Sequence, residues 1–124
     1  MAATFLQGDN RETLKTLPAG FFHAVCTSPP YWGLRSYLPD DDPNKKHELG
    51  SEATPEEFVD NLVDVFNEVW RVMRDDAVLW LNIGDSYLPD KNLAGAPWTL
   101  AFAIRDRLGM VLRDAVIWRK PCPM

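Results

Sequence analysis

The sequence predicts an α/β domain with a mostly parallel sheet, and three observations lead to this prediction. Short apolar segments that suit buried strands alternate with segments that suit helices. The spacing between these segments favours parallel strands joined by helices. The chain has 124 residues, of which 46% are hydrophobic and 25% charged, as expected for one globular domain. No stretch reaches the roughly 18 apolar residues that a membrane span requires.

The first predicted elements are a short strand at residues 4–7 and a short helix at residues 11–17. Asp9 or Asn10 caps this helix, and Glu12 follows Asp9 at the spacing of a capping box. A Pro-Ala-Gly sequence then ends the helix.

The second predicted strand, Ala24 to Thr27, is apolar and stops at Pro29 and Pro30. Residues 33–53 are polar and contain prolines, glycine and an acidic run. They predict a long surface loop, a feature that is often functional in a compact domain.

The helix that begins after Thr54 has a clear N-terminal signal. Thr54 is the predicted N-cap, Pro55 occupies the first helical position, and acidic residues follow in the first turn. Apolar residues then recur at helical spacing and predict a core face made of Phe58, Leu62, Val65, Phe66, Val69, Trp70 and Met73.

Three later segments complete the predicted fold. Residues 77–83 are mostly apolar without alternation, which favours a strand buried on both faces and places Trp80 in the core. A second helix runs from Pro97 to Leu108, with Gly109 as its C-cap. Residues 110–118 predict a further strand or a bent pair of strands, interrupted at Arg113-Asp114.

The charge and cysteine content exclude several functional classes. The formal net charge is −5, so the chain lacks the basic footprint of a free-standing nucleic-acid binder, although an enzyme acting on nucleic acid stays possible. Two cysteines are too few for a disulfide scaffold, and neither they nor the two histidines show metal-ligand spacing. The N-terminus has no signal-peptide pattern, so a cytoplasmic location is expected.

The segment Thr27-Ser28-Pro29-Pro30-Tyr31-Trp32 directly follows a predicted strand, where ligands bind in open α/β sheets. The prolines fix the backbone and remove two N–H donors, which leaves free carbonyls beside a hydroxyl and two aromatic rings. This combination suits a flat heterocycle with an exocyclic amino group. Tyr31 or Trp32 can stack on the ring, and the Ser28 hydroxyl and Pro29 carbonyl can accept the amino hydrogens.

This motif resembles that of the amino-group DNA methyltransferases, which form N4-methylcytosine or N6-methyladenine. Their catalytic motif is Asp, Ser or Asn followed by Pro-Pro-Tyr or Pro-Pro-Phe. The resemblance is to the permuted class, in which the motif lies near the N-terminus. It extends over Gly8-Asp9, residues 14–18, 24–35, 81–87 and 95–98, and residues 112–121.

The resemblance implies a Rossmann-like S-adenosylmethionine-dependent methyltransferase fold and a target base flipped out of double-stranded DNA. Serine in the first motif position favours cytosine N4 as the acceptor, whereas aspartate there would favour adenine N6. The implied catalytic residues are Ser28, Pro29, Pro30 and Tyr31. The implied cofactor contacts are Asp9 and Thr27, and the implied substrate contacts are Trp32 and Arg35.

The sequence also departs from the family pattern. It contains neither the Phe-x-Gly-x-Gly cofactor loop, nor the acid that binds the ribose, nor a target-recognition region, and its seven glycines are dispersed. Residues 1–124 are therefore interpreted as the catalytic-motif half of a methylase domain, with an incomplete sheet. Unpaired edges at residues 4–7 and 24–27 would then allow self-association. An inactive truncated methylase and an RNA or small-molecule methyltransferase are the alternatives.

Two other residues have competing interpretations. Asp9 is predicted as a helix cap, a cofactor contact or both. Asp85 follows a predicted buried strand and is either an ordinary loop carboxylate or a carboxylate that lines the site. Pro121-Cys122 resembles the nucleophile of cytosine C5-methyltransferases, but it lacks a strand-to-helix context, and a Ser-Pro-Pro-Tyr site needs no covalent step. The C5 interpretation is rejected. Candidate phosphate contacts are Arg35, Lys45, Lys46, Lys91, Arg119 and Lys120.

Overall fold

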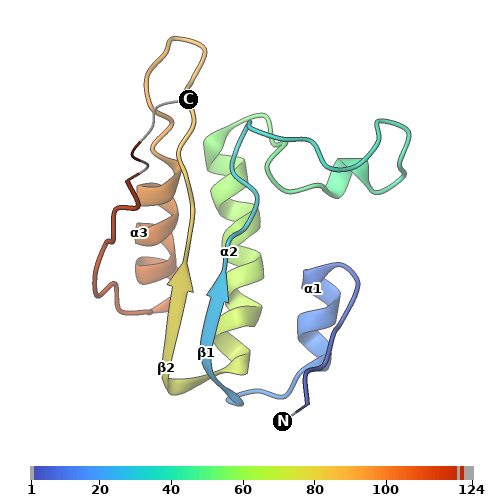
Figure 1. Ribbon diagram of the computed structural model, residues 1–124, viewed down its shortest axis with the longest axis vertical. Helices are drawn as coiled ribbons and strands as arrows, with labels where there is room; N and C mark the ends of the chain where they lie inside the picture. The colour runs from blue at the N-terminus through green and yellow to red at the C-terminus, as the bar shows by residue number, and fades with distance from the viewer. Residues whose placement is uncertain (1, 120, 122–124) are drawn as a thin grey trace.

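The computed structural model describes residues 2–119 and 121 and contains a two-stranded parallel sheet with two long helices beside it (Figure 1). The elements in chain order are α1 (Asn10–Thr13), the 3-10 helix η1 (Leu14–Thr16), β1 (Phe22–Thr27), the 3-10 helix η2 (Lys45–His47), α2 (Pro55–Val72), β2 (Met73–Leu81) and α3 (Ala96–Leu108). Strand β1, helix α2 and strand β2 form one parallel β-α-β unit. The predicted α/β class with parallel pairing is confirmed.

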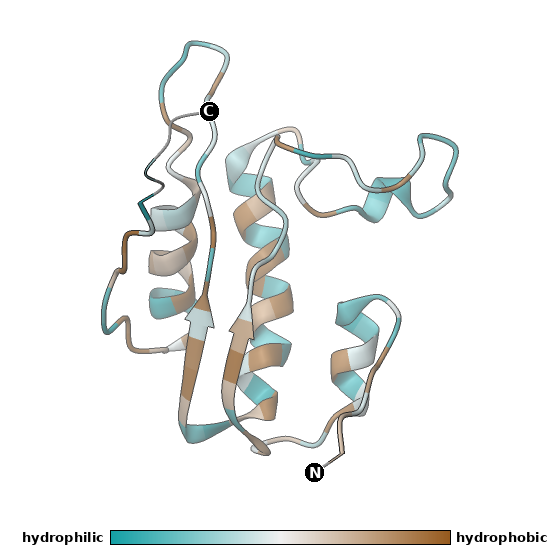
Figure 2. Cartoon of the chain, viewed as in Figure 1, coloured by the Kyte–Doolittle hydropathy of each residue, from teal (hydrophilic) through white to brown (hydrophobic). Residues whose placement is uncertain are grey.

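Helix α2 begins and packs as its sequence predicts. The Thr54 hydroxyl accepts a hydrogen bond from the Glu57 N–H at 3.2 Å, which satisfies one of the free donors at the helix start. Apolar residues alternate with polar ones along the helix (Figure 2). The buried residues of this helix are Phe58, Val59, Leu62, Val63, Val65, Phe66, Val69 and Val72. Trp70 is only half-buried, so its assignment to the core is wrong, and Met73 is buried but begins β2.

Helices α2 and α3 cover one face of the sheet and leave the other face open. Residues 77, 79 and 81 of β2 pack against the core, whereas Val78 and Trp80 are 52% and 61% exposed. In the neighbouring strand, Ala24 pairs with Val78 and Cys26 with Trp80, and both are exposed. The prediction that β2 is buried on both faces, with Trp80 in the core, is wrong. The described part of the chain provides only one covering layer.

Two predicted strands do not form. Residues 4–7 and 110–118 are irregular and almost wholly exposed, with Phe5 at 92% and Ile117 at 85% exposure. A strand needs a neighbour with which to exchange backbone hydrogen bonds, and no described segment pairs with either one. Both predictions are therefore wrong for this structure. Lys120 and Cys122 lie outside the described residues.

The start of α1 confirms Asp9 as its cap. One carboxylate oxygen of Asp9 accepts a hydrogen bond from the Arg11 N–H at 2.9 Å. Glu12 binds Lys15 at 3.0 Å, so the second half of the predicted capping box is not made. Residues 14–16 continue as a 3-10 turn, which agrees with the short helix expected here.

Arg71 near the end of α2 holds η1 and the following segment in place. Its guanidinium donates to the Leu14 carbonyl at 2.8 Å and to the Leu17 carbonyl at 3.1 Å. Together with the side chain of Leu14, which packs against the core, these charge-assisted bonds hold α1 and η1 beside α2 (Figure 1).

Helix α3 packs on α2 through Leu100, Ala103 and Ile104. It ends at Gly109, whose φ of 74° is the left-handed value typical of a C-cap, as predicted.

Among the helices that the structure describes, none combines the length and the apolar character needed to cross a membrane.

Candidate active site

The proline motif lies at the carboxyl edge of the sheet. Ser28 directly follows β1 and is exposed, whereas Pro29, Pro30 and Tyr31 are partly buried. Because β1 and β2 are parallel, both strands end at this edge, which is where α/β sheets bind ligands (Figure 1). The structure therefore brings Ser28 to Tyr31 together at the position that the sequence predicts for a site.

Asn82, the first residue after β2, joins this motif from the neighbouring strand. Its backbone N–H donates to the Thr27 carbonyl at 2.9 Å. Its side-chain Nδ2 donates to Ser28 Oγ and to Tyr31 Oη, at 3.4 Å in both cases. The sequence by itself predicts no role for Asn82. The signal that could have found it is its position one residue beyond a strand that runs parallel to β1.

Two glycines pack closely around the motif. A Cβ at Gly84 would lie 2.7 Å from Cε2 of the Tyr31 ring, and a Cβ at Gly50 would lie 2.9 Å from the Tyr31 carbonyl oxygen and 3.2 Å from Cβ of Pro30. Gly50 also has a φ of 95°, which disfavours any other residue. Only glycine fits at both positions without moving the motif. These close contacts hold the Tyr31 ring and backbone in place.

The long loop at residues 33–53 forms as predicted and is closed at its base. The Gly33 N–H donates to the Gly50 carbonyl at 2.8 Å, and Trp32 Nε1 donates to the Glu52 carbonyl at 3.0 Å. The Trp32 side chain also packs against the core. Its indole is thus an anchor for the loop, and its contact with substrate stays a prediction. Arg35 is exposed in the same loop, close in sequence to the motif.

Glu48 organises the distal part of this loop. Its carboxylate accepts hydrogen bonds from the N–H groups of Tyr37 and Leu38 and forms an ion pair with Lys45 at 2.7 Å. The hydrogen bond from Lys45, helped by the bond from Tyr37, lowers the pKa of Glu48 to about 2. Lys45, one of the candidate phosphate contacts, is occupied by this interaction.

Asp9 lies at the N-terminus of α1, beside Arg11. The Arg11 guanidinium donates to both carboxylate oxygens, at 3.0 and 2.6 Å, and this hydrogen bonding is the main reason that the pKa of Asp9 lies below its usual range. Asp9 is therefore a structural cap that is charged near neutral pH. Oδ1 accepts two hydrogen bonds from Arg11, whereas Oδ2 accepts one and can take another, so a cofactor contact through Oδ2 is compatible with this role.

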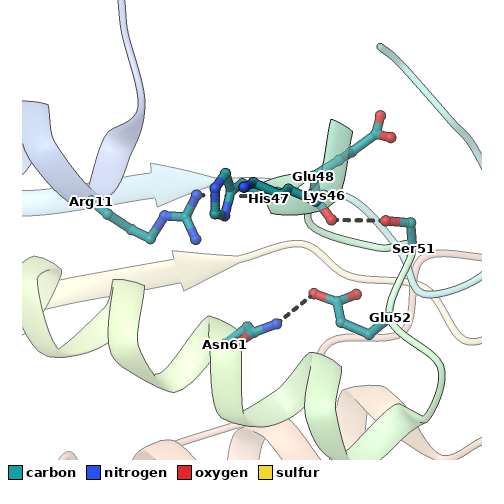
Figure 3. Close-up of a pocket in the computed structure, with 7 residues that line it drawn as sticks. All are labelled: Arg11, Lys46, His47, Glu48, Ser51, Glu52 and Asn61. Carbon is teal, nitrogen blue, oxygen red and sulfur yellow. Dashed lines mark hydrogen bonds between the residues drawn. The ribbon is translucent and has the colours of Figure 1, made fainter. Parts of the chain in front are cut away.

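A polar cleft of about 200 Å³ lies between α1, the loop and α2 (Figure 3). Arg11 reaches the His47 carbonyl from one side at 3.3 Å, and Asn61 donates to Glu52 on the other side at 3.0 Å. The residues that line it are Arg11, Lys46, His47, Glu48, Ser51, Glu52 and Asn61. None of them belongs to the proline motif, so this cleft is not the pocket predicted for the base.

Asp85 caps α3 in the structure. Its carboxylate accepts hydrogen bonds from the Gly95 and Ala96 N–H groups at 3.0 and 3.2 Å, and from the Ser86 N–H at 3.0 Å. Gly95 occupies the N-cap position of α3 but has no side chain that could accept a hydrogen bond from the first N–H groups of the helix. The Asp85 carboxylate accepts these bonds instead, from the other side of the loop. These capping hydrogen bonds explain the position of Asp85, and no role in the candidate site is needed to explain it.

The motif can bind a planar group that carries hydrogen-bond donors. Ser28 offers a hydroxyl and Pro29 a carbonyl, and the ring of Tyr31 lies beside them. The described residues contain no group of three or more His, Cys, Asp or Glu side chains placed to hold a metal ion.

Comparison with known proteins agrees with this arrangement. Residues 22–124 match the N6/N4 DNA methylase family. Over 98% of its own length, this chain is 38% identical to the type II methyltransferase M.XycI of Xanthomonas campestris pv. cyanopsidis. Over the same share of this chain, it is 36% identical to the type II methyltransferase M.Cfr9I of Citrobacter freundii. It is 37% identical to M.SmaI of Serratia marcescens over 92% of its length.

The chain spans 48%, 48% and 46% of these three relatives, which is about half of each. No solved structure matches it significantly. The parallel β-α-β unit agrees with an incomplete Rossmann-like methyltransferase fold. Since the family match covers most of the chain, from β1 onward, the chain belongs to the N6/N4 DNA methylase family.

Proposed function

We propose that this chain carries the catalytic motif of an S-adenosylmethionine-dependent DNA methyltransferase that modifies the exocyclic N4 of cytosine in duplex DNA. The observation that carries the proposal is the Ser-Pro-Pro-Tyr turn at the carboxyl end of β1, where the hydroxyls of Ser28 and Tyr31 both accept a hydrogen bond from Asn82. The family and the named type II methyltransferase relatives support the same reaction class.

The proposed chemistry is direct transfer to the amino nitrogen. Ser28 Oγ and the Pro29 carbonyl accept the amino hydrogens, which places the nitrogen and raises its electron density. Tyr31 stacks on the ring of the base. The cofactor, when bound, supplies a methyl group on a positively charged sulfur. The nitrogen–carbon bond forms as the sulfur–carbon bond breaks, and the nitrogen then loses one proton to water.

Two residues fit as cofactor contacts. The exposed carboxylate of Asp9 can accept a hydrogen bond from an adenine amino group, and Thr27 lies at the strand end that borders the motif. These two residues are insufficient to hold S-adenosylmethionine. We therefore assign the cofactor loop and the target-recognition region to a segment that corresponds to the other half of the relatives, with residues 1–124 forming the catalytic-motif half.

The proposed substrate is double-stranded DNA with the target base flipped into the site. The amino nitrogen of a stacked base is out of reach of groups at a strand end, so the base must leave the helix. The exposed guanidinium of Arg35 offers a phosphate contact close to the motif. The proposed location is the cytoplasm.

Adenine N6 is the alternative acceptor. The motif binds an amino group beside a ring nitrogen, and both bases present this edge. The serine in the first motif position favours cytosine. Transfer of labelled methyl from S-adenosylmethionine to DNA, followed by hydrolysis and identification of the modified nucleoside, tests the proposal. N4-methylcytosine supports it, N6-methyladenine corrects the acceptor, and label only in RNA or a small molecule contradicts it.

An inactive methylase fragment is the second alternative, because the described residues offer few cofactor contacts. Calorimetric titration with S-adenosylmethionine separates the two. The assay uses this chain together with any polypeptide that co-purifies with it from its host. Tight binding contradicts the inactive interpretation, whereas absence of both binding and methyl transfer supports it.

A further inference from the structure

We propose that Asn82 is a positioning residue that fixes the direction of the Ser28 hydroxyl proton. Ser28 then accepts a hydrogen bond from the amino group of the target base and donates one to the ring nitrogen beside that group. The inference rests on the proposed function and deepens it, because it names the edge of the base that the site reads.

The position of Asn82 is set by the sheet and not by its own side chain. Its backbone N–H donates to the Thr27 carbonyl at 2.9 Å, which extends the β1–β2 ladder by one residue. This bond places the Asn82 carboxamide beside the turn that Ser28 begins. Nδ2 then lies 3.4 Å from Ser28 Oγ and 3.4 Å from Tyr31 Oη.

The direction of these two hydrogen bonds follows from the chemistry of the amide. A carboxamide nitrogen carries two hydrogens and no available lone pair, so it can only donate. The hydroxyl oxygen of Ser28 must therefore accept from Asn82. A hydroxyl has two acceptor positions and one hydrogen. One acceptor position and the hydrogen of Ser28 stay free, and both can face the site.

This free pair matches one edge of an aminated base. Cytosine presents the amino group at C4 beside the ring nitrogen N3, and adenine presents the amino group at C6 beside N1. Each edge offers a donor next to an acceptor. Ser28 held by Asn82 offers an acceptor and a donor from one oxygen. Without Asn82, the Ser28 hydroxyl would rotate freely and lose this preference.

Asn82 also connects Ser28 to the stacking residue. The same Nδ2 reaches the phenol oxygen of Tyr31, whose ring is packed against Gly84. The hydroxyl that reads the edge of the base and the ring that covers its face are thus joined through one amide. Their relative placement determines whether the amino nitrogen is aligned for transfer.

Three variants separate these effects. Asn82→Leu removes both hydrogen bonds at similar size. Asn82→Asp replaces a donor by a carboxylate that can only accept, so the Ser28 proton turns toward it and away from the base. Asn61→Leu is the matched control, because Asn61 is an exposed residue whose amide donates to Glu52 outside the motif.

The first measurement does not depend on methylation. Nuclear magnetic resonance of 15N-labelled chain, with any co-purifying polypeptide bound, follows the side-chain amide signals of Asn82. We expect Ser28→Ala and Tyr31→Phe each to shift these signals, and Asn61→Leu to leave them in place. Unchanged Asn82 signals in both motif variants would overturn the inference whatever the activity of the protein.

The second measurement compares turnover on duplexes whose target base either has the ring nitrogen or carries CH in its place, as in 3-deazacytosine or 1-deazaadenine. We expect the unmodified protein to lose roughly tenfold in kcat on the CH analogue, as for one lost hydrogen bond. Asn82→Asp should show much less additional loss on the analogue, because its Ser28 proton already points elsewhere.

Equal losses in the unmodified protein and in Asn82→Asp would overturn the inference, even if both proteins methylate DNA. If no DNA is methylated, the proposed function fails while the amide signals still decide the role of Asn82. A loss in Asn82→Leu that appears only as lower stability, with kcat unchanged, also contradicts a positioning role.

Discussion

The ring of Tyr31 packs directly against the backbone of Gly84, where an added Cβ would lie 2.7 Å from Cε2 of the ring. Gly84 is not among the glycines with positive φ, so the requirement for glycine here comes from space and not from backbone conformation. The loop after β2 thereby forms a wall for the residue that we propose to stack on the base.

Gly84→Ala should displace the Tyr31 ring and lower methyl transfer by about tenfold or more, with little loss of secondary structure. Steady-state kinetics on DNA and circular dichroism measure the two effects. The control is the same substitution in a Tyr31→Ala background, where no ring is left to displace. In that background Gly84→Ala should lower the rate of methyl transfer only slightly further. A further loss as large as that in the original protein would show that Gly84 does not act through the Tyr31 ring.

In the complete protein, which includes the cofactor loop, Ser28→Ala should lower turnover by roughly 10²–10³, the usual cost of removing one preorganised hydrogen-bond group. Tyr31→Ala should also abolish or severely reduce methylation, while Tyr31→Phe should keep much of it because the ring provides the stacking. The fold should be intact in all three variants. Unchanged turnover in Tyr31→Ala would rule out the stacking role.

Glu48→Gln should loosen the loop at residues 33–53, since it removes the charge that Lys45 and two backbone N–H groups bind. Faster proteolytic cleavage in this loop measures the effect. Asp40→Asn is the control, because Asp40 is exposed and lies 4.0 Å from the same lysine. Equal cleavage of both variants would argue against Glu48 as the organising group.

The same carboxylate predicts how the order of the loop depends on pH. The pKa of Glu48 is about 2 in the folded chain, against an ordinary value of 4.5. A lowered pKa contributes stability above pH 4.5, and this contribution is lost as the pH falls from there toward 2. Loop cleavage by an acid-active protease should increase across that range, and Glu48→Gln should remove this dependence.

Asp85→Ala should destabilise α3, because it removes the acceptor for two N–H groups at the helix start. The expected cost is about 1 kcal/mol, which lowers the unfolding midpoint by several degrees in a chain of this size. Asp41→Ala, an exposed substitution in the long loop, should leave the midpoint almost unchanged. A midpoint equal to that of the original chain would contradict the capping role.

This chain purified alone should show no methyl transfer and should expose apolar surface. The open sheet face carries Val78 and Trp80, and the edge of β1 away from β2 has no described partner. We expect the chain to bind a hydrophobic dye and to self-associate, as measured by size-exclusion chromatography. Trp80→Ser should reduce dye binding more than Trp98→Ser, since Trp98 lies on α3 away from this face. A clean monomer that unfolds cooperatively without dye binding would contradict this expectation.

Local signals were sufficient for the elements that form within one segment. Thr54 and Pro55 mark the start of α2, Gly109 marks the end of α3, and the proline pair after Thr27 marks the end of β1. The bonds that start and end helices join neighbouring residues, so the sequence shows them directly. The motif from Ser28 to Tyr31 was found for the same reason, because its chemistry lies in consecutive residues.

The tertiary structure alone decided which apolar segments became buried strands and which residues joined the motif. Trp80 and residues 110–118 have the composition of buried strands, yet they are exposed, because burial requires a second layer or a neighbouring strand that a pattern cannot supply. Asn82, Gly84 and Gly50 meet the motif from distant parts of the chain. Such contacts depend on the parallel register of β1 and β2 and on closure of the long loop, which only folding establishes.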